Sequence, residues 1–338
     1  MISVQKKRGM TRCIAVAFFS LAILPSHGQV LPDAPQTPGQ NSSGIGELNI
    51  GNPQVAECEV LLRESEQEFV KEDFSSAMAA SQRAMAVCQD QTAPLLLLSR
   101  SQMLSHQFEA AEQSLHQLLG KAPSNLPALI QLGQVQYLNN HDSDAAKSFQ
   151  QAIHVAPDQP DPHYWLGRLY YQDGRVQQAI DEFQAAIRFD SAYYKAYDGM
   201  GLCYQALGQN GQAAQDFLKG IDLVHKDHPD YDVVYADFAE LLLKVNKNKQ
   251  AFDLASEAAS RNSRSPRNFF LAGKALEQDG HPDASLRWLR KAAQMDPAYP
   301  DPHYLLARIY RRQGKDAEAR QEAAILQTLA AHAPQVRR

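Results

Sequence analysis

Apolar residues recur along most of the chain at spacings of three and four, which is the period of amphipathic α-helices. The helical stretches come in pairs, and the paired unit returns every 34 residues, with starts at 58, 92, 126, 160 and 194. After a four-residue insertion at 228–231, the units resume at 232, 266 and 300. Such a period is typical of repeat proteins, in which each unit buries its apolar face only against its neighbours. The pattern therefore predicts an all-α fold of eight stacked helical hairpins.

The pentapeptide PDPHY illustrates the repeat, because it occurs at 160–164 and again at 300–304, the starts of the fourth and eighth units. A helix tolerates proline in its first turn, so Pro160 and Pro300 indicate helix starts. The eighth and twentieth positions of the units hold only small residues, which let paired helices approach closely. Glycine stands between the halves of four units, where a helix ends and the chain turns: Gly174, Gly208, Gly280 and Gly314.

The stretch PHYWLGRLYYQDGRVQQAIDEFQAAIRFD, residues 162–190, resembles the tetratricopeptide repeat, and the resemblance extends over residues 58–331. The residues that match the signature columns of that family are Leu166, Gly167, Tyr170, Gly174, Ala179, Phe183 and Ala186. The first two repeats depart from the signature, since Glu68 and Gln102 replace its tyrosine and Ser81 replaces a large apolar residue. The resemblance implies a right-handed superhelical solenoid whose first helices line a concave groove for a protein or peptide partner.

The segments outside the repeats predict export. Residues 1–28 combine basic residues, an apolar run from Cys13 to Leu24 and small residues after Pro25, which is the pattern of a secretory signal peptide. An uncleaved N-terminal anchor is the alternative. The run is shorter than the roughly 20 residues of a membrane-spanning helix, so we expect no transmembrane segment in the mature chain. Residues 29–57 are rich in Pro and Gly and predict a disordered linker, the solenoid spans 58–332, and 333–338 form a basic tail.

The charge balance argues against nucleic acid as a partner. The chain has 33 basic and 38 acidic groups, a net charge of −5. Four of the basic groups and none of the acidic ones lie in residues 1–28, so the remainder carries 29 and 38, a net charge of −9. A protein that binds nucleic acid neutralises phosphates with a basic face. We therefore expect an exported protein, periplasmic or secreted, whose partner is a protein or peptide.

Three cysteines remain after residue 28. Cys58 opens the first helix of repeat one and Cys88 ends its second helix, and these ends lie on the same side of an antiparallel hairpin. An oxidising compartment permits a disulfide between them, but the sequence leaves open whether their Cα atoms come within about 7 Å of each other. Cys203 lies inside a first helix and is interpreted as a small buried hydrophobic residue.

The groove-facing positions of the first helices hold aromatic and basic residues, which is unexpected against the net negative charge. Tyrosine and arginine often carry binding energy at interfaces, so we predict a site for an anionic or extended-peptide partner. The alternative is that the tyrosines fill space between helices and the arginines form a solvated face. The predicted partner-binding groove comprises Tyr137, Tyr164, Arg168, Tyr171, Phe270, Lys274, Tyr304, Arg308 and Arg311.

The carboxylate clamp with which some family members hold chaperone C-termini is not expected here. That clamp uses a lysine and asparagine set in consecutive first helices. The matching positions of this chain include the pairs Leu62 and Glu66, Leu96 and Arg100, and they lack the asparagines.

Catalytic motifs are absent from the sequence, and we predict no catalytic residue, no metal site and no cofactor. HExxH, CxxC, GxSxG and phosphate-loop patterns do not occur. Gly199 and Gly201 imitate the start of a dinucleotide fingerprint, but they lie within a helix and belong to the small-residue columns. His163 and His303 occupy equivalent packing columns and are interpreted as structural. We therefore expect a binding protein and not an enzyme.

The sequence thus predicts a non-catalytic scaffold or adaptor that binds a peptide or protein partner in its groove, in the cell envelope or outside it. Two alternatives stay open: an assembly factor for an envelope machine such as a pilus or secretion complex, and an accessory subunit of an envelope enzyme. Self-association is a third option, because the last helix presents Ala323, Leu326 and Leu329 with no polar capping helix after it.

Overall fold

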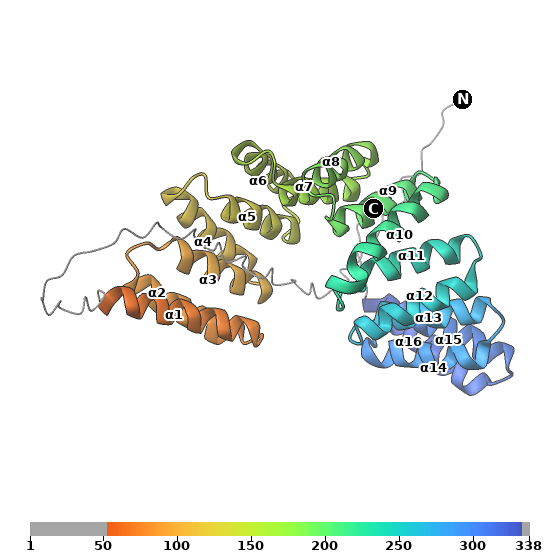
Figure 1. Ribbon diagram of the computed structural model, residues 1–338. Coiled ribbons are helices and arrows are strands. Elements are labelled where there is room, and N and C mark those ends of the chain that lie inside the picture. The colour runs from red at the N-terminus through yellow and green to blue at the C-terminus, as the bar shows by residue number, and fades with distance from the viewer. Residues whose placement is uncertain (1–52, 333–338) are drawn as a thin grey trace, which may run out of the picture. The chain divides into compact units, whose positions relative to one another are not determined.

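The computed structural model describes residues 53–332, and within that range it has sixteen helices and no strand (Figure 1). The helices are α1 Pro53–Val70, α2 Phe74–Val87, α3 Thr92–Leu104, α4 Phe108–Lys121, α5 Leu126–Leu138, α6 Asp142–Val155, α7 Pro160–Gln172, α8 Val176–Phe189, α9 Tyr194–Ala206, α10 Asn210–Asp227, α11 Val233–Lys244, α12 Asn248–Arg261, α13 Pro266–Gln278, α14 Pro282–Met295, α15 Pro300–Arg312 and α16 Asp316–His332. The predicted all-α fold is confirmed. None of these described helices is long and apolar enough to span a membrane.

The predicted signal peptide (1–28), most of the predicted linker (29–52) and the predicted basic tail (333–338) lie outside the described residues. The start of the first repeat differs from the prediction. Helix α1 begins at Pro53, so residues 53–57 are helical and the linker boundary at residue 57 is wrong. The side-chain amide of Gln54 donates a hydrogen bond to the carbonyl of Val87 at 2.9 Å, which ties this extra turn to the end of α2.

The turn inside each hairpin has the same backbone conformation in all eight repeats. The residue at position 15, counted from the start of the repeat, has a φ between 58° and 82°. Glycine enters this left-handed region without a Cβ penalty, and four turns use it as expected. The other four turns place a residue with a side chain there: Glu72, His106, Asn140 and Asn246. The left-handed turn conformation is therefore present in all eight repeats, including the four that lack the signature glycine.

The two helices of a hairpin pack where a small residue of the first helix faces a large residue of the second. A Cβ atom added to Gly167 would lie 2.9 Å from the Phe183 ring, and one added to Gly201 would lie 2.6 Å from the Phe217 ring. Phe183 also closes the junction with the next repeat, because a Cβ atom on Gly199 would lie 2.5 Å from the same ring. Gly199 and Gly201 thus belong to two packing columns.

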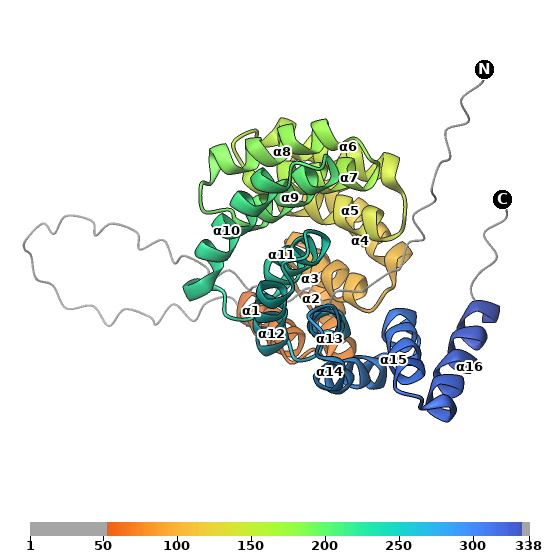
Figure 2. The same cartoon turned by 90° about the vertical axis from the view of Figure 1, so that its right-hand side faces the viewer.

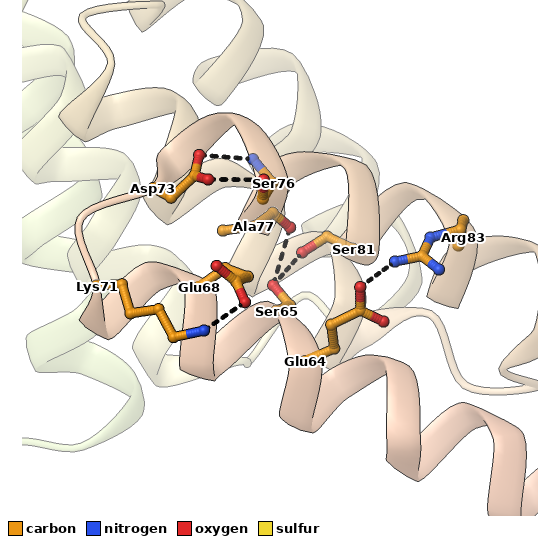
Figure 3. Close-up of polar contacts among 9 residues, drawn as sticks. All are labelled: Glu64, Ser65, Glu68, Lys71, Asp73, Ser76, Ala77, Ser81 and Arg83. Carbon is orange, nitrogen blue, oxygen red and sulfur yellow. Dashed lines mark hydrogen bonds and ion pairs between the residues drawn. The ribbon is translucent and has the colours of Figure 1, made fainter.

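The first hairpin replaces this packing with polar contacts (Figure 3). Ser65 stands at the glycine position and Ser81 at the phenylalanine position, both fully buried, with their hydroxyl oxygens 2.7 Å apart. Ser65 also donates to the carbonyl of Ala77 at 3.0 Å. Glu68, which replaces the signature tyrosine, pairs with Lys71 at 2.7 Å. These contacts compensate for the departures of repeat one from the family signature.

The described residues form two compact units, and the division falls inside α10, between Gly220 and Ile221. We call residues 53–220 the N-terminal unit and residues 221–332 the C-terminal unit. Within each unit, consecutive helices pack side by side, as α7 and α8 or α13 and α14 do (Figures 1 and 2). Within each unit, every first helix also packs against the first helix of the following repeat, for example α7 against α9 and α13 against α15. First helices therefore line one face of each unit, and they carry the predicted groove residues.

Candidate functional site

The predicted groove residues form a recurring pair of an aromatic ring and a cation. The ring is the fifth residue of a repeat and the cation is the ninth, so a spacing of four residues places them on the same face of a first helix. The cation lies 5.8 Å from the ring centre in Tyr164–Arg168, 5.7 Å in Phe270–Lys274 and 5.8 Å in Tyr304–Arg308. The same device thus occurs on α7, α13 and α15.

In the N-terminal unit these residues pack into an aromatic cluster. The guanidinium of Arg168 lies 4.9 Å from the ring centre of Trp165 and 5.5 Å from that of Tyr137. Tyr164 keeps only 7% of its surface exposed, and Tyr137 and Tyr171 are half-buried against the same cluster. Tyr164 therefore fills space between helices, and Tyr137 and Tyr171 pack partly against the same cluster, as the alternative interpretation of these positions describes.

In the C-terminal unit the predicted residues surround an open hollow of about 360 Å³ on the face of the first helices. Its lining includes Phe270, Lys274, Tyr304 and Arg308. Tyr304 is 58% exposed, whereas Phe270 is buried with its ring centre 5.3 Å from that of Tyr299. Tyr299 lines the hollow too, but the exposed Arg311 does not. We call this feature the C-terminal hollow.

The arginine of the last repeat is held by an acid of the preceding one. Arg308 Nη2 lies 2.5 Å from Oε2 of Glu277, and Arg312 Nη1 lies 2.9 Å from Oε1 of the same carboxylate. The side chain of Glu277 is only 5% exposed, so its two arginines compensate for the burial of its charge. Arg308 therefore joins α15 to α13 through an ion pair and is not merely part of a solvated face.

Arg267 makes a second tie of the same kind across the hollow's lining. Its Nη2 lies 2.6 Å from Oδ1 of Asp237 and 2.8 Å from Oε2 of Glu240, both on α11. Burial alone would lower the pKa of Arg267, but the two carboxylates outweigh it and raise that pKa. For the carboxyl group of Glu240 burial has the opposite sign and would raise the pKa, but Arg267 and Lys244 hold this pKa below its usual value. Arg267 and Glu240 thus stabilise the charged forms of each other.

Sequence reasoning missed several residues of the hollow: Glu240, Arg267, Tyr299 and Asp301 line it, and Asp237 and Glu277 hold its arginines. The repeat register contained a signal for some of them. Arg267 and Asp301 share the second position of their repeats, and Glu240 shares the ninth position with Lys274 and Arg308. The pairing of an arginine with an acid about 30 residues earlier depends on side-chain geometry, which one sequence does not display.

At the end of the solenoid, α16 packs against α15. Ala323, Leu326 and Leu329 of this last helix are half-buried. A second hollow of about 460 Å³ lies beside α16 and is lined by residues that include Pro297 and Ile325.

A disulfide joins Cys58 and Cys88 in the structure, with 5.1 Å between their Cα atoms. It links α1 to the residue that follows α2. Cys203 is buried, and burial raises the pKa of its thiol to about 12, which disfavours the reactive thiolate. Within residues 53–332, no three His, Cys, Asp or Glu side chains gather as the ligands of a metal ion would.

Two segments of the chain match family models that are both described as tetratricopeptide repeat: residues 139–194 and residues 276–338. The second segment contains Tyr304 and Arg308 of the C-terminal hollow. A comparison with curated proteins finds no match.

The fold is similar to several solved structures. A tetratricopeptide repeat protein from Parabacteroides merdae is 18% identical, with a TM-score of 0.58 over 74% of this chain and 98% of that one. Pseudomonas aeruginosa pilF is 18% identical, with a TM-score of 0.55 over 63% and 95%. A chain of the APC/C hetero-tetramer Cut9–Hcn1 is 15% identical, with a TM-score of 0.61 over 82% of this chain and 54% of that one. At these identities the likeness shows a shared solenoid fold.

Proposed function

The chain is a tetratricopeptide repeat protein, and from this premise we propose that it is a non-catalytic scaffold or adaptor. In this proposal it holds an extended peptide, or an extended segment of a protein, in the C-terminal hollow. A solenoid of this family is a scaffold for protein–protein interaction, and its first-helix face offers an extended surface.

The exposed ring of Tyr304 is the observation that carries the proposal. Tyr304 is 58% exposed at the edge of a hollow that Phe270 and Tyr299 also line. Tyrosine is enriched among the residues that dominate binding energy at interfaces. The hollow combines aromatic rings with charged groups, as the core and rim of a protein interface do. The N-terminal unit offers no comparable exposed ring among its predicted groove residues, since those are buried or half-buried.

Binding and not turnover is supported by the state of the charged groups. Arg267, Glu240 and Arg308 are engaged in ion pairs that join neighbouring repeats. A proton-transfer group works best with a pKa near the operating pH, whereas arginine stays protonated and the pKa of Glu240 is held below its usual value. We therefore assign these residues to support of the binding surface.

We place this activity in the cell envelope or outside the cell, on the basis of the signal-peptide pattern in residues 1–28. The disulfide of the first repeat is consistent with an oxidising compartment. Mass spectrometry of the protein expressed in its source organism should find a chain that begins at Gln29. A chain that keeps residues 1–28 and stays with the cytosolic fraction would contradict this placement.

A capture experiment tests the function. The bait is the chain from Gln29 onward, and the prey is the cross-linked cell-envelope fraction of the source organism. We expect Tyr304→Ala to reduce recovery of a discrete partner at least tenfold, which corresponds to an interface residue worth about 1.4 kcal/mol or more. Leu218→Ala is the matched control, because Leu218 is 55% exposed on α10 of the N-terminal unit. Equal recovery by the Tyr304 variant would exclude the hollow as the binding site.

The identity of the captured partner separates the remaining options. A component of a pilus or secretion complex would make the chain an assembly factor, and an envelope enzyme would make it an accessory subunit. Recovery of the chain alone, from differently tagged copies, would indicate self-association, and the hollow beside α16 would then be the first surface to alter.

A further inference from the structure

Three cations line the C-terminal hollow, and two of them are already neutralised. Arg267 is paired with Asp237 and Glu240, and Arg308 is paired with Glu277. In both cases the acid belongs to the preceding repeat. The third cation is Lys274. Among the described residues no carboxylate forms an ion pair with it, and its ammonium lies 5.7 Å from the ring centre of Phe270.

The repeat register explains why Lys274 lacks the partner that Arg308 has. Both residues are ninth in their repeats. Arg308 meets Glu277, which stands 31 residues earlier in the chain. The residue 31 positions before Lys274 is Leu243, which is buried in α11. The position 31 residues earlier therefore holds an acid for Arg308 and an apolar residue for Lys274.

An ammonium without an ion-pair partner favours an incoming carboxylate. Lys274 is a half-buried residue, and no existing ion pair has to break when a carboxylate arrives. The resulting hydrogen bond would be charge-assisted at both ends. Lys274 and Phe270 both line the hollow, so a carboxylate that enters it can meet this amine.

The remaining charges limit the partner to a single acidic group at this position. Two acids, Glu240 and Asp301, line the hollow together with the three cations, so the lining is nearly balanced. A polyanion such as nucleic acid would meet these acids and the paired arginines. One carboxylate beside apolar groups suits the surface better, because Tyr304, Leu271 and Leu305 also line the hollow.

We propose that Lys274 is the specificity-determining cation of the C-terminal hollow and binds one Asp or Glu side chain of an extended partner segment. An apolar or aromatic side chain next to that acid packs against the exposed Tyr304. This inference rests on the proposed function and adds the chemistry of the segment. It differs from recognition of a chain terminus, because the acid is a side chain.

Phage display tests the inference directly, because it samples every peptide chemistry at once. The probe is a library of random 12-residue peptides fused through their C-termini to a coat protein, so that no peptide has a free terminal carboxylate. The chain from Gln29 onward is immobilised as wild type, Lys274→Met, Lys274→Glu and Tyr304→Ala. Met keeps most of the apolar stem of lysine and removes the charge. Lys291→Met is the control, because Lys291 is exposed on α14 and does not line the hollow.

The wild type and Lys291→Met should select peptides in which Asp or Glu, next to an apolar residue, is enriched about fivefold over the unselected library, the ratio expected of one modest polar contact. Lys274→Met should lose the acidic preference and keep the apolar one, and Lys274→Glu should select Lys or Arg instead. Far-ultraviolet circular dichroism on each variant should show that the helices are intact.

Four other outcomes would overturn the inference, and they are distinguishable. A wild-type consensus without an acid, or an acidic consensus that survives Lys274→Met, would remove the role of Lys274 and leave peptide binding in place. The wild type could also select no consensus, or one that Tyr304→Ala selects equally well. Either result would remove the proposed function and this inference together.

Discussion

The Nδ1 atom of His163 lies 2.7 Å from Oε2 of Glu182, and the same atom of His303 lies 2.6 Å from Oε2 of Glu322. In both repeats the histidine stands in the first helix and the glutamate 19 residues later in the second. The histidine of each PDPHY segment therefore ties the two helices of its own hairpin. The recurrence of this pentapeptide has a structural cause.

The first pair predicts a pH-dependent stability. Burial of His163 would lower its pKa, but hydrogen bonds to Glu182 and to the carbonyl of Pro157, with the charge of Glu182, raise the pKa overall. Because the folded-state pKa lies above the unfolded value of about 6.5, the stabilisation is present in full below that value and is lost as the pH rises through the folded-state pKa.

We therefore expect Glu182→Gln to lower the free energy of unfolding by about 1–2 kcal/mol near pH 6 and by much less near pH 9. Thermal unfolding followed by circular dichroism at the two pH values measures this difference. Asp181→Asn is the control, since Asp181 is an exposed carboxylate on the same helix. An equal loss at both pH values would show that the charge of His163 does not contribute.

The turn conformation predicts opposite effects for the same substitution at two glycines. Gly174 has a φ of 74° and no neighbour within 4 Å of an added Cβ atom, so Gly174→Ala adds backbone strain alone. It should lower the free energy of unfolding by about 1 kcal/mol. Gly120 lies within α4 with equally open surroundings, and Gly120→Ala should raise the free energy by about 0.5–1 kcal/mol. Chemical denaturation decides, and two changes of the same sign would contradict the account.

The Phe183 ring predicts coupling between neighbouring repeats. Gly199→Ala should lower the free energy of unfolding by about 1–3 kcal/mol, because the new methyl group meets that ring. Phe183→Leu frees space, so Gly199→Ala should be less costly in a protein that carries Phe183→Leu than in the wild type. A double-mutant cycle measures the coupling. Strict additivity of the two substitutions would show that the ring does not hold this junction.

The cysteines predict a simple labelling result. Alkylation of the chain from Gln29 onward under denaturing, non-reducing conditions should label one thiol, that of Cys203, because Cys58 and Cys88 are bonded. Reduction before alkylation should raise the number to three. Replacement of both bonded cysteines by alanine should lower the free energy of unfolding of this end repeat by about 2–4 kcal/mol. Three labelled thiols without reduction would contradict the bond.

The fold was accessible from the sequence because each hairpin obeys local rules. The 34-residue period, the helix-starting prolines and the turn glycines each have a local physical cause, and eight copies reinforce one another. The sequence did not reveal that Glu72, His106, Asn140 and Asn246 adopt the glycine conformation. Nor did it reveal that α1 starts at Pro53, where Gln54 donates a hydrogen bond to the carbonyl of Val87, 33 residues away in the chain.

The site was only partly accessible. The register placed Phe270, Lys274, Tyr304 and Arg308 on one face, and these residues do line a hollow. The same register placed Tyr164 on that face as well, but Tyr164 is buried by the rings of Phe183 and Tyr193. Whether a groove position is open or filled depends on the side chains of two neighbouring repeats, and this information is not local.

The central claim is that a partner contacts the C-terminal hollow at Tyr304, and photo-crosslinking tests it most directly. A benzophenone amino acid would replace Tyr304 in one protein and Leu218 in another, since both positions are more than half exposed. The account predicts that irradiation in the source organism attaches a discrete partner at position 304 and none at position 218. A partner attached equally at both positions, or only at position 218, would contradict it.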